Sequence, residues 1–174
     1  CYDFLNLGND ITLENNSSEE KFDTLLNNTI DLKGSDLVFT SEKNIINLSG
    51  IMGSLKSSCT KETKNVLIEC AYFKPESIIG KAIKYNIHSD ASHKFERGTD
   101  PKCHEKVLRR FIQIVSEHAE IVKLELYENN NNIHTLELPF DVSKVNKILG
   151  TNISSEYYKN ALTKLGFSVN KTIK

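Results

Sequence analysis

Residues 21–53 constrain the fold most, because short apolar segments alternate with turn sequences throughout this stretch. The first turn is Asn27-Asn28, a pair that tolerates the positive φ angles of a tight hairpin turn. A second polar turn follows residue 40. The pattern predicts an antiparallel, hairpin-rich start with two pairs of strands, 22–26 with 29–32 and 37–40 with 45–52.

Residues 66–73 are a continuous apolar run interrupted by one carboxylate, Glu69. We expect a buried strand here, in which an acid is out of place. From the residues alone, Glu69 has three possible interpretations. It is a residue at a surface edge, a buried carboxylate paired with Arg97 or a lysine, or a ligand-recognition group in a pocket. The ion pair is the commonest of these. Pro75 is then expected to open a helix that continues to about residue 85.

Residues 88–101 contain five charged side chains and two histidines between two predicted helices. Composition alone favours a solvated loop with its own hydrogen bonds. Asp100 would cap the next helix, with Pro101 at its first position, where a missing N–H costs nothing. That helix, 101–119, has an apolar face expected to pack on a sheet and a basic face expected to be solvated.

The texture of the sequence changes after Pro139. Before it, apolar and polar residues alternate in 123–127 and 133–138, on either side of an Asn tract, and this pattern suggests one more hairpin. After it, the expected elements are two helices and a strand: 142–149 ended by Gly150, 155–165 capped by Ser154 and ended by Gly166, and 167–170. We therefore predict an α+β chain with two domains, 1–137 and an incomplete 138–174.

Composition and missing motifs exclude several classes of protein. The chain is 39% apolar and 26% charged, as in soluble globular proteins, and has neither a membrane-length apolar run nor a signal-peptide pattern. A net charge of −1 argues against a stand-alone nucleic-acid binder. The four cysteines lack metal-ligand spacing and are expected to be reduced thiols. Nucleotide-binding, serine-hydrolase and kinase signatures are absent from the sequence.

Three segments taken together resemble one known family. They are LSGIMG at 48–53, LIECAYFKP at 67–75 and SDASHKFERGTDP at 89–101. In this order and spacing they closely resemble the β subunit of bacterial-type phenylalanyl-tRNA synthetase. The resemblance implies that 1–137 correspond to the editing module, the combined third and fourth blocks, with mixed hairpin-rich sheet layers and packed helices. Residues 138–174 would open the fifth block, a small helical, winged-type α+β domain.

The activity that this resemblance implies is hydrolysis of tyrosine mischarged onto the tRNA for phenylalanine. A synthetic pocket for a phenylalanine ring rejects an analogue that merely adds a hydroxyl by only about a hundredfold. A second site must therefore accept the hydroxyl and refuse the bare ring. A buried carboxylate does so, because phenylalanine would leave it desolvated and unpaired.

The resemblance also assigns residues to the implied site. Glu69 would recognise the tyrosine hydroxyl, and the other substrate-binding residues would be Ser49, Gly50, Gly53, Ser89 and Ala91. Ser89 stands where the family usually has threonine, while Ser49 and Ser54 replace a common alanine and glycine. No catalytic residue is certain in the chain and no metal ligand is expected. The family's histidine is expected just before Cys1, in a His-Ala-Phe-Asp-type motif whose remainder is Cys1-Tyr2-Asp3.

The same resemblance implies cofactors and partners for the whole synthetase. ATP and Mg2+ would serve the complete ligase, with neither bound by this segment. The partners would be the tRNA for phenylalanine and the synthetase α subunit in an α2β2 assembly, in the cytoplasm and without a membrane. The alternative is a non-catalytic structural or tRNA-supporting module with decayed editing, which the serine exchanges favour. A more distant alternative is a stand-alone relative that binds or deacylates free tRNA.

Overall fold

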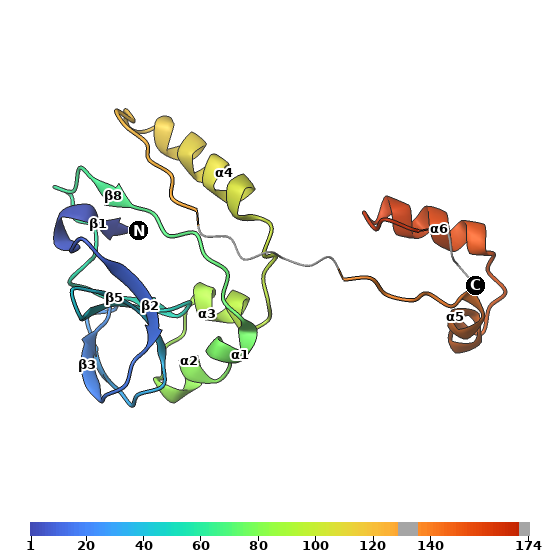
Figure 1. Cartoon of the computed structure of the whole chain (residues 1–174), viewed down its shortest axis with the longest axis horizontal. Helices are drawn as coiled ribbons and strands as arrows, with labels where there is room; N and C mark the ends of the chain where they lie inside the picture. The colour runs from blue at the N-terminus through green and yellow to red at the C-terminus, as the bar shows by residue number, and fades with distance from the viewer. Residues whose placement is uncertain (129–135, 171–174) are drawn as a thin grey trace. The chain divides into compact units, whose positions relative to one another are not determined.

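The computed structural model describes residues 1–128 and 136–170, and the chain divides into two compact units, Cys1–Glu128 and Asn129–Lys174. The first unit combines small antiparallel sheets with four helices, and the described part of the second is helical (Figure 1). The predicted α+β class is therefore confirmed.

All three sheets of the first unit are antiparallel. The largest has the strand order β2 (Ile11–Asn15), β5 (Leu37–Ser41), β6 (Asn44–Leu48) and β7 (Met52–Gly53). Two-stranded sheets pair β3 (Glu20–Asp23) with β4 (Thr29–Leu32) and β1 (Tyr2–Asp3) with β8 (Val66–Leu67). A 3-10 helix, η1 (Phe4–Asn6), follows β1.

The turns explain why the two predicted hairpins form. Asn27 adopts φ 58° in the β3–β4 connection, as expected for this residue type. Glu42 and Lys43 adopt φ 46° and 69° between β5 and β6, because a two-residue hairpin turn of type I′ needs positive φ at both positions. Both hairpins are confirmed, although β3 ends at Asp23 rather than continuing to residue 26.

Two predicted strands are shorter than expected. The chain does not run straight over 45–52 but reverses at 49–51, where Gly50 has φ 69°, so that Leu48 of β6 pairs with Met52 of β7. Only Val66–Leu67 of the predicted strand 66–73 is paired. The continuous apolar run was misleading because Ala71 and Phe73 pack in or against the core without joining a sheet.

The core of the first unit is formed by strands and the short helices together. Its buried members are Phe22, Leu32, Val38, Leu48, Ile51, Phe73, Ile78, Tyr85 and Ile87. Phe73 is 3% exposed, and its ring centroid lies 6.1 Å from that of Phe39 and 5.0 Å from that of Phe95 in edge-to-face geometry. The segment after β8 is therefore held by aromatic packing.

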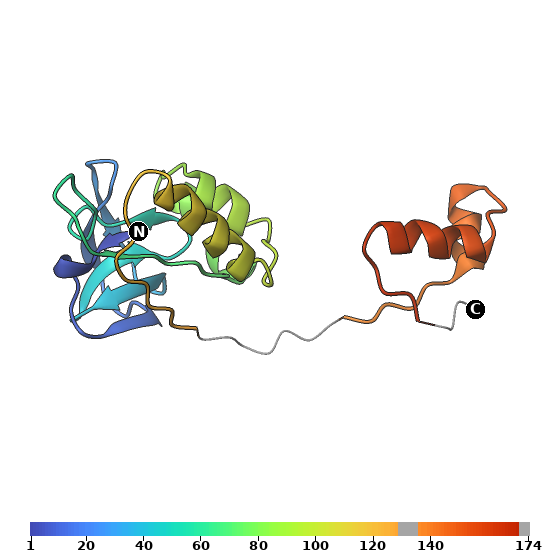
Figure 2. The same ribbon diagram turned by 90° about the horizontal axis from the view of Figure 1, so that it is seen from above.

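The first unit has four α-helices: α1 (Pro75–Ile78), α2 (Lys81–Lys84), α3 (Asp90–Phe95) and α4 (His104–Ser116). Figures 1 and 2 show α1–α3 gathered beside the sheets. The single helix predicted for 75–85 is wrong, because Gly80 breaks it with φ 78°. The predicted loop 88–101 instead contains α3.

Helix α4 begins later than predicted and is less buried. The Asp100 side chain accepts a hydrogen bond from Lys102 N at 2.9 Å in a turn, so Pro101 precedes the helix instead of starting it. None of the residues of α4 is fully buried, and Val107 on its apolar side is 49% exposed. The expected burial of its apolar face against a sheet is therefore not observed in this unit.

The helices of the second unit agree with their sequence signals. Helix α5 (Val142–Leu149) is capped by Asp141 and ends at Gly150 in the left-handed conformation. Helix α6 (Ser155–Lys164) is capped by Ser154. Tyr158 joins the two helices, because its hydroxyl donates to Asn146 Oδ1 at 2.9 Å.

The hairpin and the strand predicted near the second unit are not observed. Residues 123–127 and 136–138 form no strand, and 133–135 of the same predicted hairpin lie outside the described residues. Residues 167–170 form no strand either. Alternation alone was insufficient here, because a strand also needs a partner.

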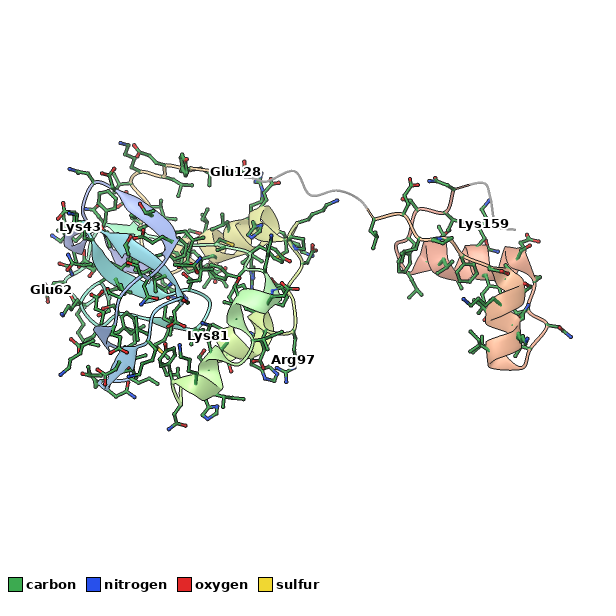
Figure 3. The ribbon with its side chains drawn as sticks, turned by 60° about the horizontal axis from the view of Figure 1, so that its bottom comes forward. Lys43, Glu62, Lys81, Arg97, Glu128 and Lys159 are labelled. Atoms are coloured by element: carbon green, nitrogen blue, oxygen red, sulfur yellow. The ribbon has the colours of Figure 1, made fainter. Side chains whose placement is uncertain are left out.

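A buried carboxylate ties the sheets to α2. Asp36 has a fully buried side chain and pairs with Lys81 Nζ at 2.6 Å and Lys84 Nζ at 3.3 Å, while the Tyr85 hydroxyl donates to it (Figure 3 labels Lys81). Burial raises the pKa of the Asp36 carboxyl, but the bonds from Lys81, Tyr85 and Lys84 lower it by more. The net pKa therefore lies below its ordinary value.

We predict that this cluster stabilises the fold in an acid-sensitive way. Because the folded-state pKa of Asp36 is lowered, its contribution is present above its unfolded pKa of about 3.9 and is lost as pH falls through the folded-state value. Asp36→Asn should reduce the free energy of unfolding by about 1–3 kcal/mol at pH 7. Urea titrations at pH 7, 4 and 3 should show this difference shrinking below pH 4.

The matched control is Asp31→Asn, which changes an exposed carboxylate on β4. It should leave the urea midpoint unchanged at all three pH values. A constant difference between wild type and Asp36→Asn down to pH 3 would contradict the assignment.

Candidate functional site

Glu69 binds two side chains from distant parts of the first unit. The Tyr2 hydroxyl donates to Glu69 Oε2, and Asn47 Nδ2 donates to the same oxygen at 2.9 Å. Asn47 Nδ2 also lies 2.6 Å from the Tyr2 hydroxyl oxygen. We call Tyr2, Asn47 and Glu69 the Glu69 cluster.

The ion pair considered for Glu69 is not observed. Arg97 Nη1 instead pairs with Glu96 Oε1 at 2.8 Å, and its side chain is 60% exposed (Figure 3 labels Arg97). Within the described part of the chain, no cation forms a salt bridge with Glu69. Glu69 is therefore held by neutral donors.

Strand pairing explains how the Glu69 cluster forms. Tyr2 of β1 is paired with Leu67 of β8, and Glu69 lies two residues further along the same segment. Diagonal positions across an antiparallel pair are within reach of an aromatic side chain, so the Tyr2 ring can extend to Glu69. The third member, Asn47, comes from β6 of the larger sheet.

The environment keeps the Tyr2 phenol protonated. Tyr2 is 5% exposed, and its burial, followed by the charge of Glu69 and the hydrogen bond to it, raises the pKa of the phenol. Asn47 opposes this shift through its own hydrogen bond. Because the raised pKa lies above that of an ordinary tyrosine, Tyr2 remains a hydrogen-bond donor at neutral pH.

A second group of predicted residues surrounds the turn between β6 and β7, which we call the Gly50 turn (residues 49–51). A Cβ atom on Gly50 would lie 2.9 Å from Ile78 Cδ1 and 3.0 Å from Phe73 Cδ2, so the backbone there packs directly on the core. The Ser89 hydroxyl donates to the Ile51 carbonyl at 2.7 Å and accepts from Ser92 N at 3.1 Å. Ser89 thus caps α3 and fastens it to the Gly50 turn.

Ser49 has the only buried side-chain oxygen without a hydrogen-bond partner among the described residues. It is 1% exposed, and its backbone N–H donates to Leu37 O at 3.0 Å. Buried hydroxyls are usually paired, so an unpaired one at a predicted site needs an explanation. A ligand or a water molecule that reaches this oxygen would provide one.

Gly53 and Ala91 occupy different surroundings. Gly53 on β7 is paired with Asn47 on β6, and an added Cβ would lie 2.9 Å from Cδ1 of Leu25, a half-exposed side chain. Ala91 lies on α3 and is exposed. A larger side chain at Gly53 or Ala91 would therefore meet less steric hindrance than one at Gly50.

The structure thus divides the predicted residues into two groups. Asn47 links Glu69 to Gly53, while Ser49, Gly50 and Ser89 meet at the Gly50 turn, and no hydrogen bond between described residues joins Glu69 to Ser49 or Ser89. Sequence reasoning missed Tyr2 and Asn47. Asn47 could have been noticed as a polar residue between Ile46 and Leu48, by the same argument that singled out Glu69.

The rest of the described chain contains few other candidates for chemistry. No group of three or more His, Cys, Asp or Glu side chains in residues 1–128 or 136–170 is arranged to hold a metal ion. All four cysteines are free thiols. None of the described helices is long and apolar enough to cross a membrane.

Comparison with known proteins places the chain in a family. The B3/4 domain model matches residues 1–120, and the chain belongs to this family. Curated relatives named phenylalanine–tRNA ligase beta subunit include those of Francisella tularensis, 37% identical over 150 residues (84% of this chain, 19% of the relative), and Photorhabdus laumondii, 31% identical over 174 residues (97% and 22%). The chain spans about a fifth of the length of these relatives.

We predict that Ser89 matters for stability through its hydroxyl. Ser89→Ala removes the cap of α3 and the bond to Ile51 O, and should lower the free energy of unfolding by about 1–2 kcal/mol. Ser89→Thr keeps the hydroxyl and should cost less than half as much. Urea denaturation measures both variants, and equal losses for alanine and threonine would contradict the capping role.

Proposed function

We propose that this chain carries the editing site of a phenylalanine–tRNA ligase beta subunit and hydrolyses tyrosine esterified to the tRNA for phenylalanine. The observation that carries the proposal is the bond between the Glu69 carboxylate and a phenol hydroxyl, here that of Tyr2. Asn47 holds the same carboxylate oxygen in place. A carboxylate positioned in this way can bind the group that distinguishes tyrosine from phenylalanine.

The specificity of such a site follows from the cost of an unpaired polar group. A tyrosyl ester can offer its phenol to Glu69, whereas a phenylalanyl ester cannot. A partly buried carboxylate that loses a donor retains its desolvation cost, so the phenylalanyl ester would bind poorly and would not be hydrolysed. This is the discrimination that a synthetic pocket for phenylalanine does not provide.

The proposed reaction is ester hydrolysis. A water molecule attacks the carbonyl carbon of the aminoacyl ester, the bond from that carbon to the ribose oxygen breaks, and a proton passes from the water to the leaving oxygen. Free tyrosine and uncharged tRNA result. The residues of this chain would bind and orient the substrate, and the buried Ser49 hydroxyl is available for a substrate atom or the water.

The remaining expectations belong to the same proposal. Residues 1–137 would form the editing module and 138–174 the start of the fifth block. The tRNA for phenylalanine and the ligase α subunit would be the partners, and the complete ligase would use ATP and Mg2+ outside this segment. Gly53 would lie beside the Glu69 cluster, and Gly50, Ser89 and Ala91 would shape the part of the pocket next to the Gly50 turn.

A second candidate function is a non-catalytic module that supports the tRNA or the subunit. It is favoured by one observation: the phenol-binding carboxylate is already occupied by Tyr2. Hydrolysis of tyrosyl-tRNA separates the two functions, because only the first requires it.

We predict that Glu69→Ala slows the hydrolysis of tyrosyl-tRNA. The full-length gene product that carries this chain, assembled with its α subunit, should release tyrosine from tyrosyl-tRNA, and the variant should do so about 10- to 100-fold more slowly because a hydrogen bond to a charged group is lost. The measurement is release of radiolabelled tyrosine from the purified tRNA ester.

The control is Glu62→Ala, which removes an exposed carboxylate of the same unit (Figure 3 labels Glu62). It should hydrolyse tyrosyl-tRNA at the wild-type rate. Equal rates for wild type and Glu69→Ala would remove Glu69 from the site, and no hydrolysis by any of the three would favour the supporting module.

A further inference from the structure

The Tyr2 side chain presents the chain's own phenol to the Glu69 carboxylate. Oε2 of Glu69 accepts from both the Tyr2 hydroxyl and Asn47 Nδ2, and one carboxylate oxygen offers about two acceptor positions. An incoming phenol therefore finds this oxygen occupied. The occupant is chemically the same group as the side-chain end of a tyrosyl substrate.

The backbone around Tyr2 is held by hydrogen bonds, so only the Tyr2 side chain can move to release Glu69. Tyr2 is paired with Leu67, Asp3 N donates to Ser57 O at 2.9 Å, and Phe4 N donates to Asn65 O at 2.9 Å. Rotation of the Tyr2 ring is then the direct way to free Glu69. A substrate that binds Glu69 must cause this rotation or share the carboxylate.

We propose that Tyr2 is a specificity-determining residue of the Glu69 site, because its hydroxyl competes with the phenol of a tyrosyl ester for the same carboxylate. This inference rests on the proposed editing function. It goes beyond that function by assigning selectivity to a residue outside the six expected from the sequence.

Two consequences follow for the two esters. A tyrosyl ester has to displace the Tyr2 hydroxyl, which weakens its binding. A phenylalanyl ester does not leave Glu69 unpaired, because Tyr2 already satisfies it, so the penalty that should exclude phenylalanine is reduced. Tyr2 therefore lowers the ratio of tyrosyl to phenylalanyl hydrolysis from both directions.

The test is Tyr2→Phe in the full-length gene product assembled with its α subunit. This variant keeps the ring and removes only the hydroxyl. The ratio of kcat/KM for tyrosyl-tRNA over phenylalanyl-tRNA should rise about tenfold or more, as expected for the loss of a competing hydrogen bond to a charged group. The change should lie mainly in KM for the tyrosyl ester, and Tyr2→Leu should change the ratio in the same direction.

Two further variants separate competition from general effects on the structure. Tyr85→Phe removes a buried phenol bound to the carboxylate of Asp36, a network that shares no residue with the Glu69 cluster, and should leave the ratio unchanged. The double variant Tyr2→Phe with Glu69→Gln should not show the increased kcat/KM ratio, because the freed acceptor is then no longer a carboxylate.

The outcomes distinguish this inference from the proposed function. An increased ratio that depends on Glu69 supports the inference, including the case in which wild type is inactive and Tyr2→Phe hydrolyses tyrosyl-tRNA. Glu69-dependent hydrolysis with a ratio unchanged or lowered by Tyr2→Phe overturns the inference and leaves the editing function intact. An increased kcat/KM ratio that persists in the double variant also overturns the inference. Absence of hydrolysis in every variant overturns both.

Discussion

The close approach of the Gly50 backbone to the core is the constraint on which the rest of the first unit depends. Only a residue without a Cβ can combine φ 69° with a position so near Ile78 and Phe73. This turn folds β7 back on β6 and thereby places Asn47 opposite Gly53. It also presents the Ile51 carbonyl to Ser89, which positions α3.

Two carboxylates of the first unit, the buried Asp36 and the partly buried Glu69, have different surroundings. Asp36 is surrounded by two lysines and a tyrosine, so its charge is compensated and it acts as a link between elements. Glu69 accepts from neutral donors in Tyr2 and Asn47 and has no salt bridge within the described part of the chain. Among the described residues Glu69 lacks such compensation by a cation, and its contact with Tyr2 shows that this carboxylate accepts a hydrogen bond from a phenol hydroxyl.

Local signals were sufficient wherever a single residue controls the backbone. Asn27, Gly150 and Ser154 predicted a turn, a helix end and a helix start, and all three agree with the structure. Periodicity failed where tertiary contacts decide. The apolar run after Leu67 contributes Phe73 to the core without strand pairing, because hydrophobicity predicts burial but not the presence of a neighbouring strand.

By itself, the sequence determined the α+β class, the two hairpins that precede Gly50, the helices of the second unit and the family, because these depend on local conformation and on motifs that can be read in order. Glu69 was also marked by sequence alone, as an acid in an apolar run. Only the tertiary structure decided what Glu69 binds. Tyr2 is 67 residues away and Asn47 is 22, and strand pairing across such separations is set by the packing of the whole unit.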